Sequence, residues 1–124
     1  MIVGLDSNII IDFLEGNLDL DFSNEYVVTQ ITYLECLQGI NPTHHKISKV
    51  YANFFDNIQI LPLTNNAIRL STKLFWDLRK KGTEIPLSDC LISQILLENG
   101  VFKLLTQDTK HFKRIPGLKV CDFK

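Results

Sequence analysis

The sequence predicts an α/β protein in which a parallel sheet is covered by helices on both faces. Two observations carry this prediction. Short apolar runs of strand length alternate along the chain with longer segments of helical periodicity, and glycine or proline separates these segments at short intervals. The 124 residues, 45% of them hydrophobic, are enough for one domain with a substantial core. We therefore expect residues 1–124 to form a single domain.

The first third of the chain predicts two strands with a helix between them. Residues 2–5 (IVGL) form a short apolar run that is typical of a buried strand and ends at Asp6. Residues 7–15 carry apolar side chains at helical spacing, and Gly16 follows them as a stop signal. Residues 26–30 (YVVTQ) are mostly aromatic or β-branched, which favours a second strand.

The middle of the chain predicts two helices and a third strand. Residues 31–38 form the first of these helices, which Gly39 closes. Thr43 is placed to cap the second helix, which runs to about Asp56. The short apolar segment 58–61 then predicts a strand.

The last part of the chain predicts two longer helices and three short elements. Thr64 is placed to cap a helix that has one apolar face and ends at Gly82. A further helix starts at Ser88 and stops at Asn99. The remaining elements are a strand at 102–105, a helical turn at 109–114 and a strand at 118–122.

Three features of the sequence limit the cellular setting. No apolar run approaches the ~18 residues that a membrane span needs. The first residues, MIVGLDSN, lack the basic segment of a signal peptide. The three cysteines, Cys36, Cys90 and Cys121, are odd in number and far apart, which favours reduced thiols. We therefore expect a cytoplasmic protein with no membrane segment and no disulfide.

The net charge of −1 hides an uneven distribution of charge. Residues 1–45 hold seven acidic residues and no lysine or arginine, whereas residues 46–124 hold all 13 basic residues and seven acidic ones. Such a division fits a cation site beside a surface for a polyanion. It fits equally well two halves that simply attract each other in the folded chain.

Four acidic residues fall where one edge of the predicted sheet would gather them. Asp6 and Asp108 each follow a predicted strand. The carboxyl ends of parallel strands meet at the edge where open α/β sheets bind their ligands. Asp89 lies in the first turn of a helix, and Glu35 lies one turn into the helix after the second strand. We expect all four carboxylates at one rim.

A carboxylate cluster with no cysteine or histidine beside it predicts a hard divalent cation. Like charges repel and push each group toward protonation, and a cation removes that repulsion. Oxygen ligands favour Mg²⁺ or Mn²⁺ over Zn²⁺. Such an ion activates water and neutralises charge on a phosphoryl group, so the predicted chemistry is phosphodiester hydrolysis. Five basic residues are candidates to hold the phosphate backbone, namely Lys103, Lys110, Lys113, Arg114 and Lys119.

Each of these acids also has a simpler interpretation. Asp6 and Asp108 are placed to cap the helices that follow them. Asp89 in a first helical turn gains from the helix dipole without any metal, and Glu35 fits a solvated helix residue. His111 fits a packing or surface residue better than a general base.

The whole chain resembles a PIN domain, and more narrowly a VapC-type toxin ribonuclease of the VapBC toxin–antitoxin class. Four segments carry the resemblance in order. They are LDSNIIIDFLEGN with Asp6, VTQITYLECLQGI with Glu35, EIPLSDCLISQILLENG with Asp89, and LLTQDTKHFKRIPGLKV with Asp108. The last segment is the most specific. The resemblance implies a three-layer α/β/α PIN-like fold with a mostly parallel central sheet.

The same resemblance implies roles for individual residues. The catalytic and metal-binding quartet for Mg²⁺ or Mn²⁺ would be Asp6, Glu35, Asp89 and Asp108. Thr106 matches an auxiliary hydroxyl of the family, and Ser7 and Asn8 match the small polar residues beside the first aspartate. Because no acid of the quartet is missing, the resemblance implies an active endoribonuclease.

Partners follow from the resemblance as well. It implies a homodimer, an RNA substrate and a VapB-type antitoxin whose C-terminal segment enters near the acidic groove. The long helix after Thr64, which carries Trp76, is a candidate contact surface, although core packing explains it equally well. Two other functions stay open: a PIN nuclease of RNA maturation or decay without an antitoxin, and a non-catalytic PIN module that binds RNA or protein. A phosphoryl-acceptor receiver domain ranks lower, because Asp89 and Asp108 come late in the chain.

Overall fold

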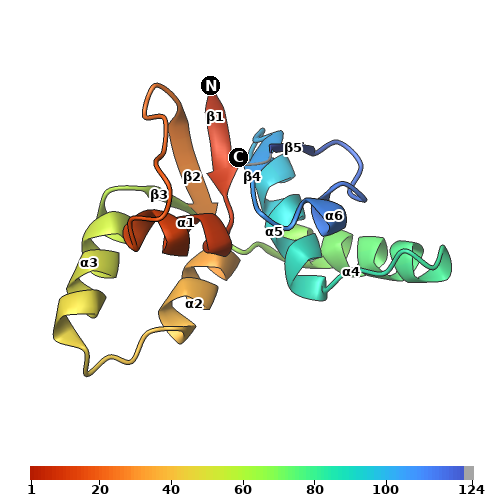
Figure 1. Cartoon of the computed structure of the whole chain (residues 1–124). Helices are drawn as coiled ribbons and strands as arrows, with labels where there is room; N and C mark the ends of the chain where they lie inside the picture. The colour runs from red at the N-terminus through yellow and green to blue at the C-terminus, as the bar shows by residue number, and fades with distance from the viewer. Residues whose placement is uncertain (122–124) are drawn as a thin grey trace.

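Strands and helices alternate along the chain, as the sequence predicts (Figure 1). The computed structural model describes residues 1–121. In chain order the elements are β1 (Ile2–Leu5), α1 (Ser7–Leu14), β2 (Glu25–Thr29), α2 (Gln30–Gln38), α3 (His45–Asp56), β3 (Gln59–Leu61), α4 (Asn65–Lys80), α5 (Leu87–Glu98), β4 (Lys103–Leu105), α6 (Thr109–Phe112) and β5 (Lys119–Cys121). The last residue of the strand predicted at 118–122 lies outside the described residues.

The five strands form one parallel sheet in the order β3-β2-β1-β4-β5. β1 is the central strand, and its Gly4 is paired with Val27 of β2 on one side and with Leu104 of β4 on the other. The chain therefore leaves β1 toward one edge of the sheet and later returns to β1 from the other side. From the carboxyl ends of β1 and β4 the chain runs in opposite directions, toward β2 and toward β5. In parallel sheets such a divergence opens a crevice between the two strand ends.

Helices cover both faces of the sheet, which confirms the predicted three-layer α/β/α arrangement. Side chains alternate between the faces along each strand, so Val27 packs into one core and Val28 into the other. The first core lies under α4, α5 and α6 and includes Ile95 and Leu104. The second lies under α1, α2 and α3 and includes Ile9, with Ile11 and Tyr33 packed at its margin. Figure 1 shows the two helical groups on opposite sides of the strands.

A glycine in the central strand lets α5 lie directly on the sheet. A Cβ atom at Gly4 would lie 2.8 Å from one Cδ atom of Leu96 and 2.9 Å from the other, closer than packed carbon atoms approach. Leu96 is 1% exposed and has little room to move. The missing side chain thus sets how closely the helix that carries Asp89 approaches β1.

Thr43 and Ser88 do not mark helix starts as predicted, whereas Thr64 does. Thr43 does not cap α3. Its N–H and hydroxyl both donate to the Asn41 carboxamide, so it belongs to a turn that precedes the helix. α5 begins at Leu87 after Pro86, one residue earlier than predicted, because proline fixes the entry to the helix. Thr64 does cap α4, and its hydroxyl accepts the N–H of Ala67 at 3.0 Å.

Two further findings concern the residues that the structure describes. No helix there combines the length and apolarity needed to cross a bilayer. Cys36, Cys90 and Cys121 are all free thiols, the first two of them buried.

Candidate functional site

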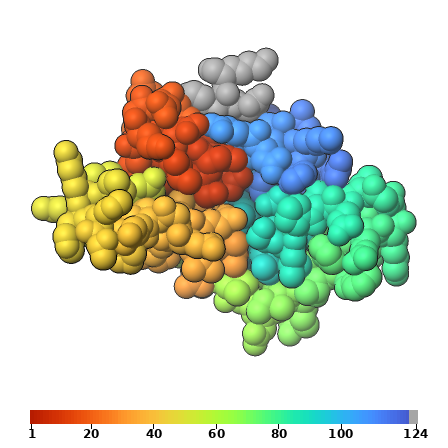
Figure 2. All heavy atoms as spheres, turned by 60° about the horizontal axis from the view of Figure 1, so that its bottom comes forward, coloured from red at the N-terminus to blue at the C-terminus, as the bar shows by residue number. Residues whose placement is uncertain are grey.

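The structure brings the four predicted acids together at the carboxyl edge of the sheet. Asp6 follows β1, Asp108 follows β4, Glu35 lies on α2 and Asp89 on α5. Repulsion from Asp108 raises the pKa of Asp6, repulsion from Asp6 and Asp89 raises that of Glu35, and repulsion from Asp6 and Asp108 raises that of Asp89, so the four share one field of negative charge. Figure 2 turns this edge toward the viewer, and the red, orange, teal and blue segments that carry the acids meet on that face.

Asp6 is the most tightly held of the four. Its side chain is buried, and its residue as a whole is 6% exposed. Oδ1 accepts the N–H of Ser7 at 2.8 Å, while Oδ2 accepts the Thr106 hydroxyl at 2.7 Å and lies 3.5 Å from Nδ2 of Asn8. The capping interpretation is therefore correct for one oxygen, whereas the other is held by a residue about 100 positions away in the chain.

Thr106 and Asn8 join the loops that follow β1 and β4. The fully buried Thr106 hydroxyl donates to Asp6 and accepts the N–H of Asp108 at 2.9 Å. Oδ1 of Asn8 accepts the N–H of Gln107 at 3.2 Å. These bonds fix Asp6 relative to Asp108 across the crevice between the two strands.

Replacing Thr106 by valine is expected to lower the free energy of unfolding by about 1–3 kcal/mol, because valine keeps the shape but removes both hydrogen bonds of the hydroxyl. Those bonds are the one donated to Oδ2 of Asp6 and the one accepted from the Asp108 N–H. Urea denaturation measures the change. Thr106→Ser retains the hydroxyl and serves as the matched control. Equal stability of the valine and wild-type proteins would contradict the bridging role.

Glu35 is a charged group in an unfavourable environment. Burial raises the pKa of its carboxyl to about 7, repulsion from Asp6 and Asp89 adds to the shift, and the nearby Ser7 hydroxyl works in the opposite direction. Oε1 is buried and has no hydrogen-bond partner among the described residues. A buried carboxylate oxygen normally has a hydrogen-bond partner. The interpretation of Glu35 as a solvated helix residue is therefore wrong, and Oε1 is placed to bind a cation or a proton.

His111 also belongs to this cluster. Its Nδ1 lies 3.0 Å from Oδ2 of Asp89 and 2.8 Å from Oδ2 of Asp108. The ligand atoms of these three residues all lie within 4.8 Å of one another. The prediction of a carboxylate cluster without histidine is therefore wrong, and His111 is not merely a packing residue. The spacing of three residues between Asp108 and His111 on α6 was the available signal, because residues i and i+3 share a helix face.

Proton affinity is raised at two of the aspartates as well. Burial raises the pKa of Asp6, although the bonds from Thr106 and Ser7 oppose it, and repulsion from Asp108 contributes. Burial also raises the pKa of Asp89, the contact with His111 lowers it, and repulsion from Asp6 and Asp108 raises it again. Binding of protons or metal cations therefore stabilises a cluster of this kind.

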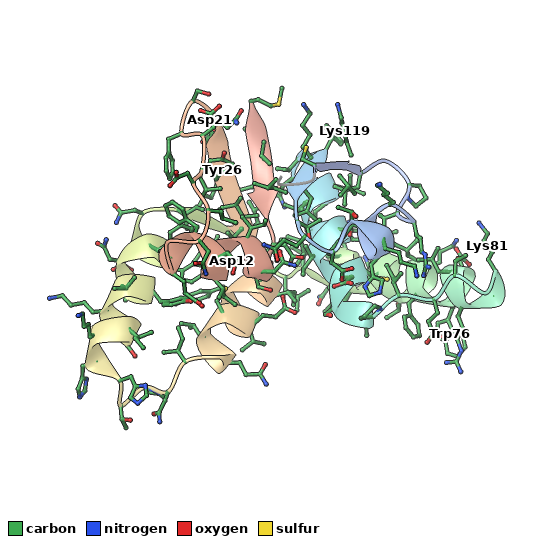
Figure 3. The ribbon with its side chains drawn as sticks, viewed as in Figure 1. Asp12, Asp21, Tyr26, Trp76, Lys81 and Lys119 are labelled. Atoms are coloured by element: carbon green, nitrogen blue, oxygen red, sulfur yellow. The ribbon has the colours of Figure 1, made fainter. Side chains whose placement is uncertain are left out.

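The basic residues are less concentrated near the cluster than predicted. Lys103 and Lys119 are paired at the first positions of β4 and β5, at the edge of the sheet opposite to the acids. Figure 3 shows Lys119 on that edge. Nζ of Lys103 lies 2.9 Å from the Met1 sulfur. Both residues are therefore wrongly placed by the sequence prediction, since a strand start and a strand end lie at opposite edges.

Three of the predicted basic residues lie on or just after α6, beside His111. Lys110 and Lys113 are exposed. Arg114 donates from Nη1 to the Glu84 carbonyl at 3.0 Å, which links α6 to the loop before α5. Of the five predicted basic residues, only these three therefore lie on the side of the acidic cluster.

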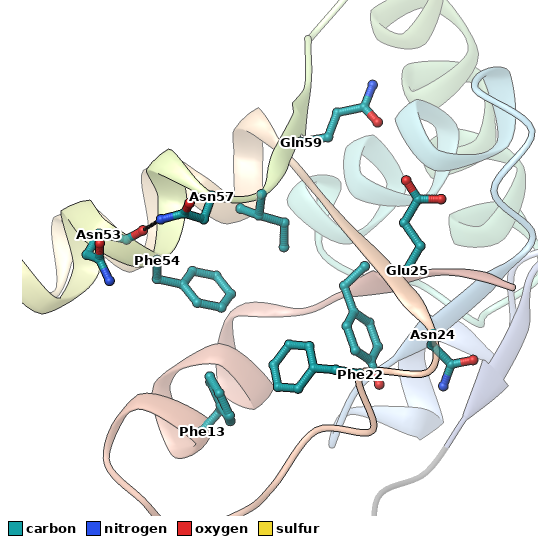
Figure 4. A pocket seen from close by; sticks show the side chains of 10 residues that line it. Phe13, Phe22, Asn24, Glu25, Asn53, Phe54, Asn57 and Gln59 are labelled. Atoms are coloured by element: carbon teal, nitrogen blue, oxygen red, sulfur yellow. Dashed lines mark hydrogen bonds between the residues drawn. The ribbon is translucent and has the colours of Figure 1, made fainter.

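Two hollows of the described surface lie apart from the acids. One of about 410 Å³ is bordered by Phe13, Phe22 and Phe54, and Asn57 donates to the Asn53 carbonyl at its rim (Figure 4). Another, of about 540 Å³, lies among α1, α2 and α3. Neither is lined by a member of the acidic quartet.

Comparison with known proteins identifies the family. The family model of the PIN domain matches residues 3–118, so the chain belongs to the PIN domain family. No curated protein matches the sequence.

Solved structures with the same fold come from bacterial VapBC assemblies. A chain of VapBC2 from Rickettsia felis, bound to a DNA fragment from the promoter, has a TM-score of 0.84 and 23% identity, with 100% of both chains covered. DNA-bound VapBC from Salmonella typhimurium gives a TM-score of 0.83 and 21% identity, with 98% of each chain covered. VapBC-1 from nontypeable Haemophilus influenzae gives 0.79 and 25%, again with 98% of each chain covered.

Proposed function

We propose that this chain is a metal-dependent endoribonuclease, built as a single PIN domain, and that it is the toxin of a type II toxin–antitoxin pair. One observation carries the proposal. Carboxyl groups from four separate segments meet at the switch point of a parallel sheet, and one of their oxygens, Oε1 of Glu35, is buried with no hydrogen-bond partner in residues 1–121.

The donor set fits a hard divalent cation. Asp6, Asp89 and Asp108 would hold the ion directly, and Glu35 would hold a second ion or orient the attacking water. Carboxylate oxygens are the ligands that Mg²⁺ and Mn²⁺ prefer. When bound, such an ion lowers the pKa of a coordinated water and neutralises charge on the phosphoryl group.

The chain's own residues supply position and proton affinity. The Thr106 hydroxyl and the Ser7 N–H hold the Asp6 carboxylate in one orientation, so little reorganisation is needed when phosphate enters. A Glu35 carboxyl whose pKa lies at about 7 is suited to accept a proton from water near neutral pH. Exposed Lys110 and Lys113 beside the cluster would contact neighbouring phosphates.

The toxin assignment is supported by the VapBC assemblies that share this fold over nearly the whole chain. We expect a VapB-type antitoxin as a partner and a homodimer in solution. The exposed side chains of α4, Leu70 at 43% and Trp76 at 54%, are available for such contacts, whereas Leu78 on the same helix is buried in the core. Light scattering of the purified chain measures the oligomer. Growth arrest on expression, relieved by the product of an adjacent small gene, tests the antitoxin.

Metal-dependent cleavage of RNA is the direct test of the activity. We expect the purified chain to cut total RNA into discrete fragments with Mg²⁺ or Mn²⁺, to stop when EDTA is added, and to resume when metal is restored. Single-stranded DNA of matched length tests the preference for RNA. No cleavage by folded, metal-loaded protein across several RNA pools would favour a non-catalytic binding module. Cleavage without growth arrest would favour a nuclease of RNA maturation.

A further inference from the structure

His111 occupies a position that the acidic quartet alone does not explain. Its Nδ1 is within 3.0 Å of Oδ2 of Asp89 and within 2.8 Å of Oδ2 of Asp108, and these two carboxylates come from different elements. The histidine side chain is 34% exposed and that of Asp108 is 40% exposed, so the group of three is open to solvent on one side. An ion can therefore reach it from solution.

The lone pairs of His111 Nδ1, Asp89 Oδ2 and Asp108 Oδ2 face one another, and a positive charge between them would stabilise the group. A neutral imidazole with its proton on Nε2 presents a lone pair at Nδ1 to two carboxylate oxygens, and all three repel one another. A proton on Nδ1 points well at only one of the two oxygens at a time. One cation among the three atoms satisfies all of them.

The distances match those between ligands of one metal ion. Octahedral ligands held at about 2.1 Å from a cation lie about 3.0 Å from their neighbours, because adjacent ligands subtend a right angle at the ion. Nδ1 of His111 lies 3.0 Å and 2.8 Å from the two carboxylate oxygens, and the three ligand atoms all lie within 4.8 Å of one another.

We propose that Nδ1 of His111 is a direct ligand of the divalent cation, together with Asp89 and Asp108, and that it biases the site toward Mn²⁺ over Mg²⁺. This inference rests on the proposed function, since it concerns the same metal site. Imidazole nitrogen binds the later first-row ions more readily than it binds Mg²⁺, which prefers oxygen. The nitrogen therefore strengthens binding of one metal and adds little to the other.

Pulsed electron paramagnetic resonance of the full chain loaded with Mn²⁺ tests this ligand directly. The protein should carry no histidine tag. We expect the ¹⁴N modulation of a coordinated imidazole in the wild type and its loss in His111→Gln. His45→Gln is the matched control, because His45 is exposed at the start of α3. Calorimetry should show that His111→Gln lowers Mn²⁺ affinity about tenfold or more and Mg²⁺ affinity by less than about threefold.

The outcomes separate this inference from the function on which it rests. Bound Mn²⁺ without ¹⁴N modulation, or equal losses of affinity for both metals, would overturn the role of His111 and leave the oxygen-ligated site in place. Failure of the folded wild type to bind Mn²⁺ at all would overturn both proposals. Retention of the modulation in His111→Gln would assign the nitrogen to another residue and refute the inference.

Discussion

Asp6→Asn is expected to lower the rate of RNA cleavage by about three orders of magnitude, because loss of metal-held charge stabilisation at a phosphoryl group is worth several kcal/mol. Asparagine keeps the size of the side chain and still accepts the Ser7 N–H as a helix cap. It removes the negative charge in the centre of the cluster, and it places an amide nitrogen where Oδ2 of Asp6 accepts the Thr106 hydroxyl. Single-turnover cleavage of a defined RNA at saturating Mn²⁺ measures the effect.

The same substitution should not unfold the metal-free protein, because two effects on its stability oppose each other. Asp6 is buried, and both its burial and Asp108 oppose its ionisation, so removal of the charge relieves a cost that the wild type carries at neutral pH. The loss of the Thr106 bond works against this gain, so we expect the Tm in EDTA to stay within about 5 °C of that of the wild type. Asp21→Asn, in an exposed turn where asparagine still accepts the Ser23 N–H, should leave both cleavage and Tm unchanged. Retained cleavage in Asp6→Asn would remove Asp6 from the active site.

Much of the site was predictable because it depends on chain direction. In a parallel sheet every strand ends at the same edge, so residues directly after β1 and β4 must lie near each other once those strands are neighbours. Asp6 and Asp108 follow these strands, and the bond from Thr106 to Asp6 crosses between them. The positions of Glu35 and Asp89 depend on helix orientation, which periodicity alone does not fix. The sequence prediction placed them at the same rim only on the assumption of a compact fold, and the resemblance to the PIN domain then implied their roles in the quartet.

The errors concern register and direction within short elements. Lys103 and Lys119 are close in sequence to Asp108, but each stands at the start of a strand and so points to the far edge of the sheet. For His111 the sequence predicts a packing or surface role. Only the packing of α6 against α5 brings its ring to Asp89. Contacts between elements of this kind are set by tertiary packing, which local sequence patterns do not encode.

The metal-free protein is expected to lose stability as the pH rises from about 4.5 to about 7. The Glu35 carboxyl has a model-compound pKa of 4.5 and a folded-state pKa of about 7. Between these values the folded chain binds more protons than the unfolded chain, so the free energy of unfolding falls with rising pH. The loss from Glu35 is about 1–2 kcal/mol after allowance for the solvent that reaches this half-buried group. The raised pKa values of Asp6 and Asp89 act in the same direction.

Urea denaturation in EDTA at intervals between pH 4.5 and pH 8 measures this dependence. Glu35→Gln should flatten the profile and be more stable than the wild type at pH 8, because the amide carries no charge into the cluster. Glu25→Gln, at the exposed start of β2, is the matched control and should follow the wild type. Mn²⁺ at 100 times its Kd should restore about 2.7 kcal/mol at pH 8. If the stability of Glu35→Gln changed with pH as that of the wild type does, Glu35 would not titrate between pH 4.5 and pH 8. The proposal that Glu35 accepts a proton from water during cleavage would then lose its basis.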